Sequence, residues 1–164
     1  MAFMRRKSRR IRHMQRSRRR HRGGASTAAG LNFPNNAIAV SFGETKVDGA
    51  QLPREVTAVA PTIALTGVTA PFCSVICFDP DATAPCWIHM FKANCANCEL
   101  VTGTDAFEWT PPAPAKGIHK YIFGLFTHEY PMTEFPKERG YFDVAAFTKA
   151  NGMRAHSAVY MKSA

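Results

Sequence analysis

The chain has 164 residues, of which 46% are hydrophobic, and it carries a formal net charge of +9. That length and composition can fill one hydrophobic core without disulfides or metal ions, so one folded domain is expected. The longest uncharged stretch, residues 56–78, is long enough to span a bilayer. Pro61, Gly67 and Pro71 interrupt it, which argues against a transmembrane helix and favours strands joined by a turn.

The positive charge is concentrated in residues 1–22, an arginine-rich arm. Eleven of the 21 basic residues and none of the 12 acidic residues lie there, so the rest of the chain holds 10 basic and 12 acidic residues. Such a segment repels itself and buries little apolar surface, which predicts disorder or a transient helix in solution. The candidate polyanion-binding residues of the arm are Arg5, Arg6, Arg9, Arg10, Arg12, Arg16, Arg18, Arg19, Arg20 and Arg22.

The composition of the arm leaves three uses open. It can bind nucleic acid, it can be attracted to an anionic membrane or an acidic protein surface, or it can target the chain to the nucleus or an organelle. Binding to nucleic acid would be independent of base sequence and would weaken steeply with salt, because each neutralised phosphate releases counterions.

Residues 23–36, which begin with GGASTAAG, are predicted to be a flexible linker, and residues 37–164 a β domain. In that domain short β-rich runs alternate with turn residues, a spacing that predicts an antiparallel β-sandwich. One short helix is expected within residues 142–152, capped by Asp143, with Phe147 on its buried side. The predicted strands cover residues 37–42, 61–65, 72–78, 87–94, 119–127 and 155–161.

Three groups of unusual side chains stand at the ends of predicted strands. Asp79-Pro80-Asp81 closes one strand, Trp87-Ile88-His89 opens the next, and Gly117-Ile118-His119-Lys120-Tyr121 opens a third. Strand ends and the adjoining loops are where a rigid sandwich presents polar side chains together. These groups are therefore candidates for a single site.

The order of these groups resembles the signature of the phosphatidylethanolamine-binding protein family. The segments that carry the resemblance are VICFDPDATAPCWIHMFKAN, WTPPAPAKGIHKYIFGLF and YFDVAAFTKANGMRAHSAVYM. The resemblance implies an all-β antiparallel sandwich of that family's type with one or two short peripheral helices. It also implies a ligand pocket formed by Asp79, Trp87, His89, Pro112, His119 and Tyr121.

The chemistry of these residues suits an anion such as phosphate or a phospholipid headgroup. Two imidazoles and a phenol can donate hydrogen bonds to phosphate oxygens, and a carboxylate can hold one histidine in a fixed tautomer. The competing interpretation is that the histidines and Asp79 are buried structural residues. Two departures from the family pattern, Thr110 before the loop prolines and Lys120 after the second histidine, bear on ligand identity.

Two catalytic or metal alternatives use the same residues. Cys86, His89 and Asp79 have the side-chain types of a thiol hydrolase. Strand alternation, however, places His89 with Trp87 and Phe91 on one face and residues 86, 88 and 90 on the other. A metal held by Asp79, His89 and His119 is disfavoured because the resemblance points to anions. The prediction is therefore a non-enzymatic protein without cofactor or metal.

The five cysteines and the absence of an apolar leader predict an intracellular, reducing compartment, the cytoplasm or nucleus. Cys95 and Cys98 have the spacing of half a zinc site or a redox pair. Cys73 and Cys77 lie in an apolar strand, where cysteines are small buried hydrophobes. All five cysteines are predicted to be structural, and the sequence leaves open whether any of them is oxidised.

Two functional hypotheses follow. The first is a binding module with a small anion pocket, tethered to a polyanion by its basic arm. The alternative is a structural or minor capsid component of a virion or nucleoprotein assembly, which would keep a vestigial pocket and contact protein partners in that assembly.

Overall fold

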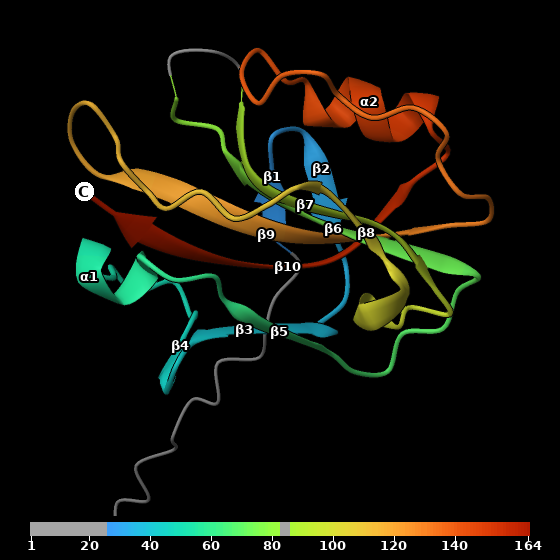
Figure 1. Ribbon diagram of the computed structural model, residues 1–164, viewed down its shortest axis with the longest axis horizontal. Coiled ribbons are helices and arrows are strands. Elements are labelled where there is room, and N and C mark those ends of the chain that lie inside the picture. The colour runs from blue at the N-terminus through green and yellow to red at the C-terminus, as the bar shows by residue number, and fades with distance from the viewer. Residues whose placement is uncertain (1–25, 83–85) are drawn as a thin grey trace, which may run out of the picture.

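A five-stranded antiparallel sheet forms the centre of the molecule in the computed structural model, which describes residues 26–82 and 86–164 (Figure 1). Its two central strands run through apolar sequence and are buried on both faces, as expected for strands covered by a layer on each side. In spatial order the strands are β10 (Arg154–Ser163), β9 (His119–His128), β6 (Phe72–Asp79), β7 (Trp87–Ala96) and β8 (Thr104–Phe107).

One face of this sheet, which we call the pocket face, carries Tyr121, Phe123 and Leu125 of β9. It packs against a three-stranded sheet in the order β4-β3-β5, which lies below the central sheet in Figure 1. That sheet comprises β3 (Ile38–Phe42), β4 (Thr45–Lys46) and β5 (Thr62–Leu65).

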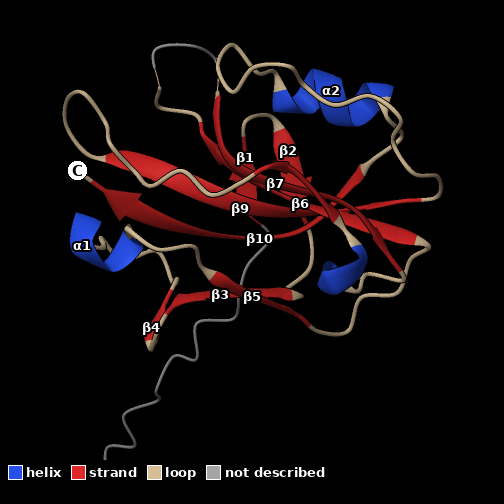
Figure 2. Ribbon diagram, in the orientation of Figure 1, coloured by secondary structure: helices blue, strands red, loops and turns tan. Residues whose placement is uncertain are grey.

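The opposite face, which we call the helix face, carries Ile122 and Phe126 of β9. Helix α2 (Val144–Ala150) and the hairpin of β1 (Ser26–Ala28) and β2 (Leu31–Phe33) cover it (Figure 2). The core is thus divided into two apolar layers by the central sheet, which confirms the predicted all-β antiparallel fold with short peripheral helices. Two further short helical turns are α1 (Arg54–Thr57) and the 3-10 turn η1 (Leu100–Thr102).

Helix α2 begins and ends where predicted. The Asp143 side chain accepts a hydrogen bond from the Ala146 amide at 2.9 Å, which caps the helix. The chain leaves the helix at Asn151 and Gly152, and the glycine has a φ of +61°. The predicted strands are also present, whereas β4, β8 and α1 escaped prediction because they are short and mostly polar.

The predicted flexible linker over residues 23–36 is wrong for the part that the structure describes. The β1–β2 hairpin places Phe33, only 1% exposed, on the helix face. Its ring meets the Phe126 ring edge to face, with the two ring centroids 5.6 Å apart. Asn35 then bridges to Ser157 of β10. Packing of Leu31 and Phe33 against the helix-face core stabilises the hairpin. The small residues that begin this segment had indicated a linker instead. Residues 1–25, with all the arginines of the arm, lie outside the described ranges.

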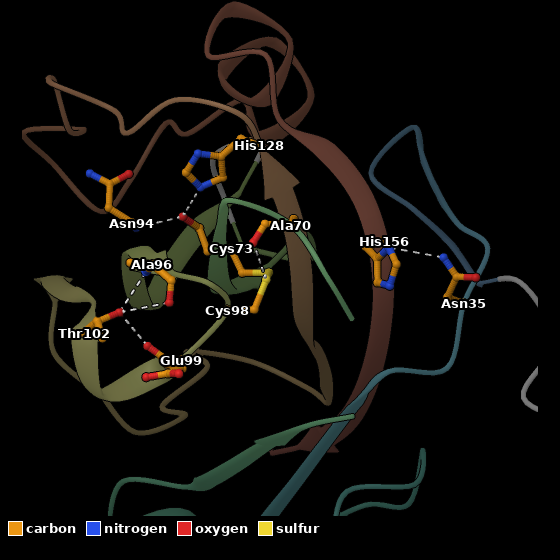
Figure 3. The surroundings of a disulfide bond; sticks show 11 residues. Asn35, Ala70, Cys73, Asn94, Ala96, Cys98, Glu99, Thr102, His128 and His156 are labelled. Carbon is orange, nitrogen blue, oxygen red and sulfur yellow. Dashed lines mark hydrogen bonds between the residues drawn. A yellow bond between two sulfur atoms is a disulfide. The ribbon is translucent and has the colours of Figure 1, made fainter. Parts of the chain in front are cut away.

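Two of the five cysteines, whose oxidation state the sequence left open, are oxidised: Cys73 and Cys98 form a disulfide (Figure 3). Their Cα atoms are 4.8 Å apart although 25 positions separate them. The turn after β7 folds back over the start of β6, which strand spacing alone does not show. Within the described ranges Cys77, Cys86 and Cys95 are buried thiols. Disulfides are typical of oxidising compartments, so the cysteines no longer support the predicted reducing compartment, which stays untested.

None of the helices in the described ranges has the length and apolar character needed to cross a bilayer. Residues 56–78 instead contain the end of α1, strand β5 and most of β6.

Candidate functional site

A cavity of about 480 Å³ opens at the end of the pocket face, where β6 ends and β7 and β9 begin. The strands contribute its polar and aromatic lining, and the segment 110–116 forms a wall rich in proline and alanine. From the strands and the turn after β6 come Asp79, Asp81, Ala82, Trp87, His89, His119 and Tyr121.

Five of the six residues predicted for the pocket line this cavity, and Pro112 does not. Pro112 is buried beneath the loop, and the neighbouring Pro111 and Pro114 face the cavity instead. The family resemblance implied that a proline of this loop forms part of the pocket. It could not show which prolines turn inward, because that depends on the path of an irregular segment.

The proline-rich wall is held at both ends. Trp109 donates a hydrogen bond from Nε1 to the Thr57 carbonyl at 3.0 Å, and its ring stacks on Phe123 of the pocket face. Arg54 donates to the Pro114 carbonyl at 3.4 Å. The wall is therefore anchored to the pocket-face core and to α1.

Asp79 and His119 form a close pair at the base of the cavity. Nδ1 of His119 lies 2.7 Å from Oδ2 of Asp79, and the other carboxylate oxygen accepts a hydrogen bond from the Asp81 amide at 2.8 Å. Because a carboxylate only accepts, the hydrogen of this pair belongs to Nδ1. Asp79 thereby fixes the ring of His119 and leaves Nε2 as its remaining polar atom.

His89 is fixed in a similar way by the backbone of the wall. Its Nδ1 donates to the Thr110 carbonyl at 2.7 Å, and the Thr110 amide donates back to the His89 carbonyl at 2.8 Å. Burial is the main cause that lowers the pKa of His89 below its ordinary value, so the ring is neutral at pH 7. Its Nε2 then carries a lone pair and can donate only after the ring takes up a proton.

Tyr121 is fully buried, and its ring meets that of His89 edge to face, with centroids 4.9 Å apart. Burial raises the pKa of Tyr121, so its hydroxyl keeps its proton and acts as a donor. Two buried side-chain oxygens in the described part of the chain lack a hydrogen-bond partner, those of Tyr121 and Ser163. Only Tyr121 lines the cavity.

A β-bulge brings His89 into the site. Phe78 pairs with Ile88 and Cys77 with Met90, so His89 is an extra residue in β7. Trp87 and His89 share the pocket face, as predicted, with ring centroids 4.5 Å apart. Beyond the bulge the predicted alternation is wrong: Met90 joins the pocket-face core and Phe91 the helix-face core.

The thiol-hydrolase arrangement is not formed. Cys86 packs in the helix-face core, on the other side of the sheet from His89, and burial raises its pKa to about 11.

Cys98 is already joined to Cys73, so it cannot contribute a thiolate to a zinc site. Across the described ranges, no three histidine, cysteine, aspartate or glutamate side chains cluster in a way that could hold a metal ion.

Two further residues shape the site. Asp81 belongs to one of the strand-end groups predicted to form it but was not assigned to the pocket, and Arg139 was missed. Oδ2 of Asp81 accepts a hydrogen bond from the Lys120 amide at 2.8 Å, which ties the turn after β6 to the start of β9. The signal for this role was its place in the Asp79-Pro80-Asp81 group. Arg139 lies in the irregular segment before α2, where no local pattern marks it. Lys120, by contrast, lies over the Tyr160 ring and does not line the cavity.

Comparison with known proteins agrees with this fold. The chain belongs to the phosphatidylethanolamine-binding protein family, because the model of that family matches residues 42–161, more than half of the chain. Among solved structures it resembles a carboxypeptidase Y inhibitor complexed with its cognate proteinase, with a TM-score of 0.66 and 18% identity over 77% of this chain and 81% of that one.

Two phosphatidylethanolamine-binding proteins of malaria parasites have similar structures. The one from Plasmodium vivax gives a TM-score of 0.62 at 16% identity, over 77% of this chain and 83% of that chain. The one from Plasmodium falciparum gives 0.60 at 16% identity, over 87% and 91% of the two chains. At these identities the comparison establishes the shared fold.

Proposed function

We propose that the cavity binds a small ligand through a phosphate or other anionic group, and that the protein acts as a binding module and not as an enzyme. The observation that carries the proposal is the Tyr121 hydroxyl. It is a protonated donor that is fully buried at the cavity, and no described group accepts its hydrogen bond. A buried donor without a partner is costly, and an anion would satisfy it.

The two histidines complement this donor. Each is held through Nδ1, His89 by a carbonyl and His119 by a carboxylate, so each has Nε2 left for a ligand. Either ring can then take up a proton and donate to a phosphate oxygen. Asp79, 2.7 Å from Nδ1 of His119, would balance the positive charge of that ring when it donates to an anion.

The surroundings of the cavity support binding without catalysis. Neither a cysteine nor a serine is among the described residues that line it. Asp79 is already engaged by His119 and by the Asp81 amide, which leaves it poorly placed to act as a nucleophile. Hydrophobic walls with a few convergent polar groups are typical of small-molecule sites.

Isothermal titration calorimetry of the full chain with O-phosphoethanolamine, inorganic phosphate and ethanolamine tests the proposal. We expect saturable one-to-one binding of the first two and none of ethanolamine alone. Tyr121→Phe removes only the hydroxyl and is expected to weaken phosphate binding about tenfold, the effect of one hydrogen bond to a charged group. Tyr130→Phe, at an exposed tyrosine remote from the cavity, is the matched control. Binding that Tyr121→Phe leaves unchanged would contradict the proposal.

We also propose that the arm tethers the protein to a polyanion. The support is compositional: residues 1–22 contain ten arginines and one lysine and no acid. We expect the full chain to bind single-stranded RNA with an affinity that falls steeply with salt, and a chain lacking residues 1–22 to lose that binding. Equal binding by both chains would overturn the tether. The alternative role in a virion or nucleoprotein assembly stays a prediction.

A further inference from the structure

Arg139 contacts the back of the bulge that presents His89. Its Nη1 donates to the carbonyls of Ile88 and His89, at 3.0 and 3.1 Å, and its Nη2 donates to the Glu108 carbonyl at 2.8 Å. The backbone is joined as well, because the Ile88 amide donates to the Arg139 carbonyl at 2.8 Å. One side chain thus links the bulged part of β7 to the segment that leads into the proline-rich wall.

The bulge explains why such a link is needed. An extra residue interrupts the regular ladder, so the backbone groups around it depend on partners outside the adjacent strand. Arg139 supplies these partners at two consecutive carbonyls, and the Thr110 amide shares the second of them. A planar guanidinium can bond several carbonyls at once, which a lysine ammonium on a flexible stem does not reproduce.

The guanidinium is also held between two aromatic rings. Its central carbon lies 5.5 Å from the Trp87 centroid and 4.8 Å from the Phe107 centroid. Trp87 lines the cavity, whereas Arg139 itself does not. Arg139 is therefore placed to fix both the aromatic and the imidazole components of this side of the site without touching a ligand.

We propose that Arg139 is a positioning residue, which holds the β7 bulge and the 108–110 segment so that His89 faces the ligand beside Tyr121. This inference rests on the proposed anion-binding function. The segment before α2 is far in sequence from the residues that line the cavity. Through Arg139 it would nevertheless control how His89 contacts an anion. His119 is held separately by Asp79, so the two rings should respond differently when Arg139 is changed.

The titration of His89 reports on its position. The groups that act on it are Asp79 from β6, His119 and Tyr121 from β9, the Thr110 carbonyl, and Arg139. Releasing the bulge would expose His89 to water, so its pKa should rise toward the ordinary value. Loss of the arginine's positive charge would by itself also raise the pKa of His89. A charge-conserving variant is therefore needed to separate the two effects.

The experiment compares Arg139→Lys and Arg139→Gln with wild type and with Arg154→Gln, an exposed arginine of β10, in the full chain. NMR follows each histidine against pH without ligand, and calorimetry measures binding of O-phosphoethanolamine. We expect both Arg139 variants to raise the pKa of His89, to leave His119 unchanged, and to weaken binding about tenfold. The Arg154→Gln variant should match wild type.

Two outcomes would overturn the inference. If Arg139→Lys gives the wild-type titration of His89 and the wild-type affinity, the charge alone suffices and the multiple bonds are not required. If His89 and His119 shift together, Arg139 supports the fold generally. Because Arg139→Lys keeps the charge and the packing stem, it provides the test even if Arg139→Gln does not fold. If the wild-type protein does not bind O-phosphoethanolamine, the proposed function is refuted. The titration of His89 in the variants would still decide the role of Arg139.

Discussion

Two histidines are buried at opposite ends of the central sheet, and their ring nitrogens are bonded differently. At the disulfide end, His128 has both nitrogens engaged, Nε2 with the Ser74 hydroxyl at 2.9 Å and Nδ1 with the Tyr130 carbonyl at 2.7 Å. Figure 3 shows His128 near Cys73 and Cys98. At the pocket end, the only hydrogen bond of the His89 ring within the described ranges is made by Nδ1.

The difference separates a structural histidine from a binding one. Burial alone does not distinguish them, since His128 and His89 are 4% and 5% exposed. A ring with both nitrogens satisfied holds the fold together. His89 instead has one ring nitrogen without a hydrogen bond, beside the cavity and next to the unpartnered Tyr121 hydroxyl. That arrangement suits a ring that binds a ligand.

The largest expected effect is on stability at the disulfide end. Reducing the Cys73–Cys98 bond, or replacing both cysteines by serine, is expected to lower the free energy of unfolding by about 3 kcal/mol, because the bond closes a loop of 25 positions in the unfolded chain. Urea unfolding with and without dithiothreitol measures it. Reductant should not affect the double variant further, and O-phosphoethanolamine binding should persist. An unchanged unfolding midpoint on reduction would contradict this.

Ser74→Ala tests the structural histidine. The Ser74 hydroxyl is buried and contacts both the His128 ring and the Asn94 amide, at 2.9 and 3.1 Å. Its removal leaves the buried His128 ring and the half-buried Asn94 backbone N–H without that partner, and is expected to cost about 2 kcal/mol of stability. Chemical denaturation measures the loss, and calorimetry should show unchanged ligand affinity. A drop in affinity with normal stability would mean that the two ends are not independent.

Tyr121→Phe should behave in the opposite way. The hydroxyl has no partner among the described residues, so its loss is expected to change the free energy of unfolding by less than about 0.5 kcal/mol or to stabilise the fold slightly. Denaturation and calorimetry on the same sample compare stability with the tenfold loss of affinity expected above. A destabilisation of several times that size would show that the hydroxyl is bonded within the protein.

The smallest expected effect is the change of stability and of ligand affinity with pH. The pKa of His89 is lowered in the fold, so the unfolded chain binds more protons below about pH 6.5, and stability is lost as the pH falls from there through the lowered pKa. Affinity for a phosphate ligand should rise over the same range, because a protonated ring becomes a donor. Denaturation and calorimetry from pH 5 to 8 test both slopes, and slopes of the same sign would contradict the assignment.

Much of this molecule could be predicted from local sequence. Strand positions followed from apolar runs, and the Asp143 cap followed from its place before an amphipathic segment. Five pocket residues were implied by the family resemblance that the motifs at strand ends carry. The remaining features depend on contacts between distant segments. The Cys73–Cys98 pairing, the hairpin that buries Phe33, and the position of Arg139 behind the bulge are set by tertiary packing, which leaves no periodic pattern.

The bulge is the clearest example. Alternation along β7 correctly placed Trp87 and His89 together and then failed at Met90 and Phe91, because one extra residue reverses the facing of all that follow. The prediction that Pro112 lines the pocket was wrong for a related reason, since an irregular loop has no fixed alternation of side chains.

We propose above that the cavity binds an anion, and protonation of a histidine should accompany that binding. Calorimetry of the full chain with O-phosphoethanolamine at pH 7, in two buffers of different ionisation enthalpy, tests it most directly. We expect saturable one-to-one binding with net uptake of protons from the buffer. Absence of binding at millimolar ligand, or binding that releases protons, would contradict it.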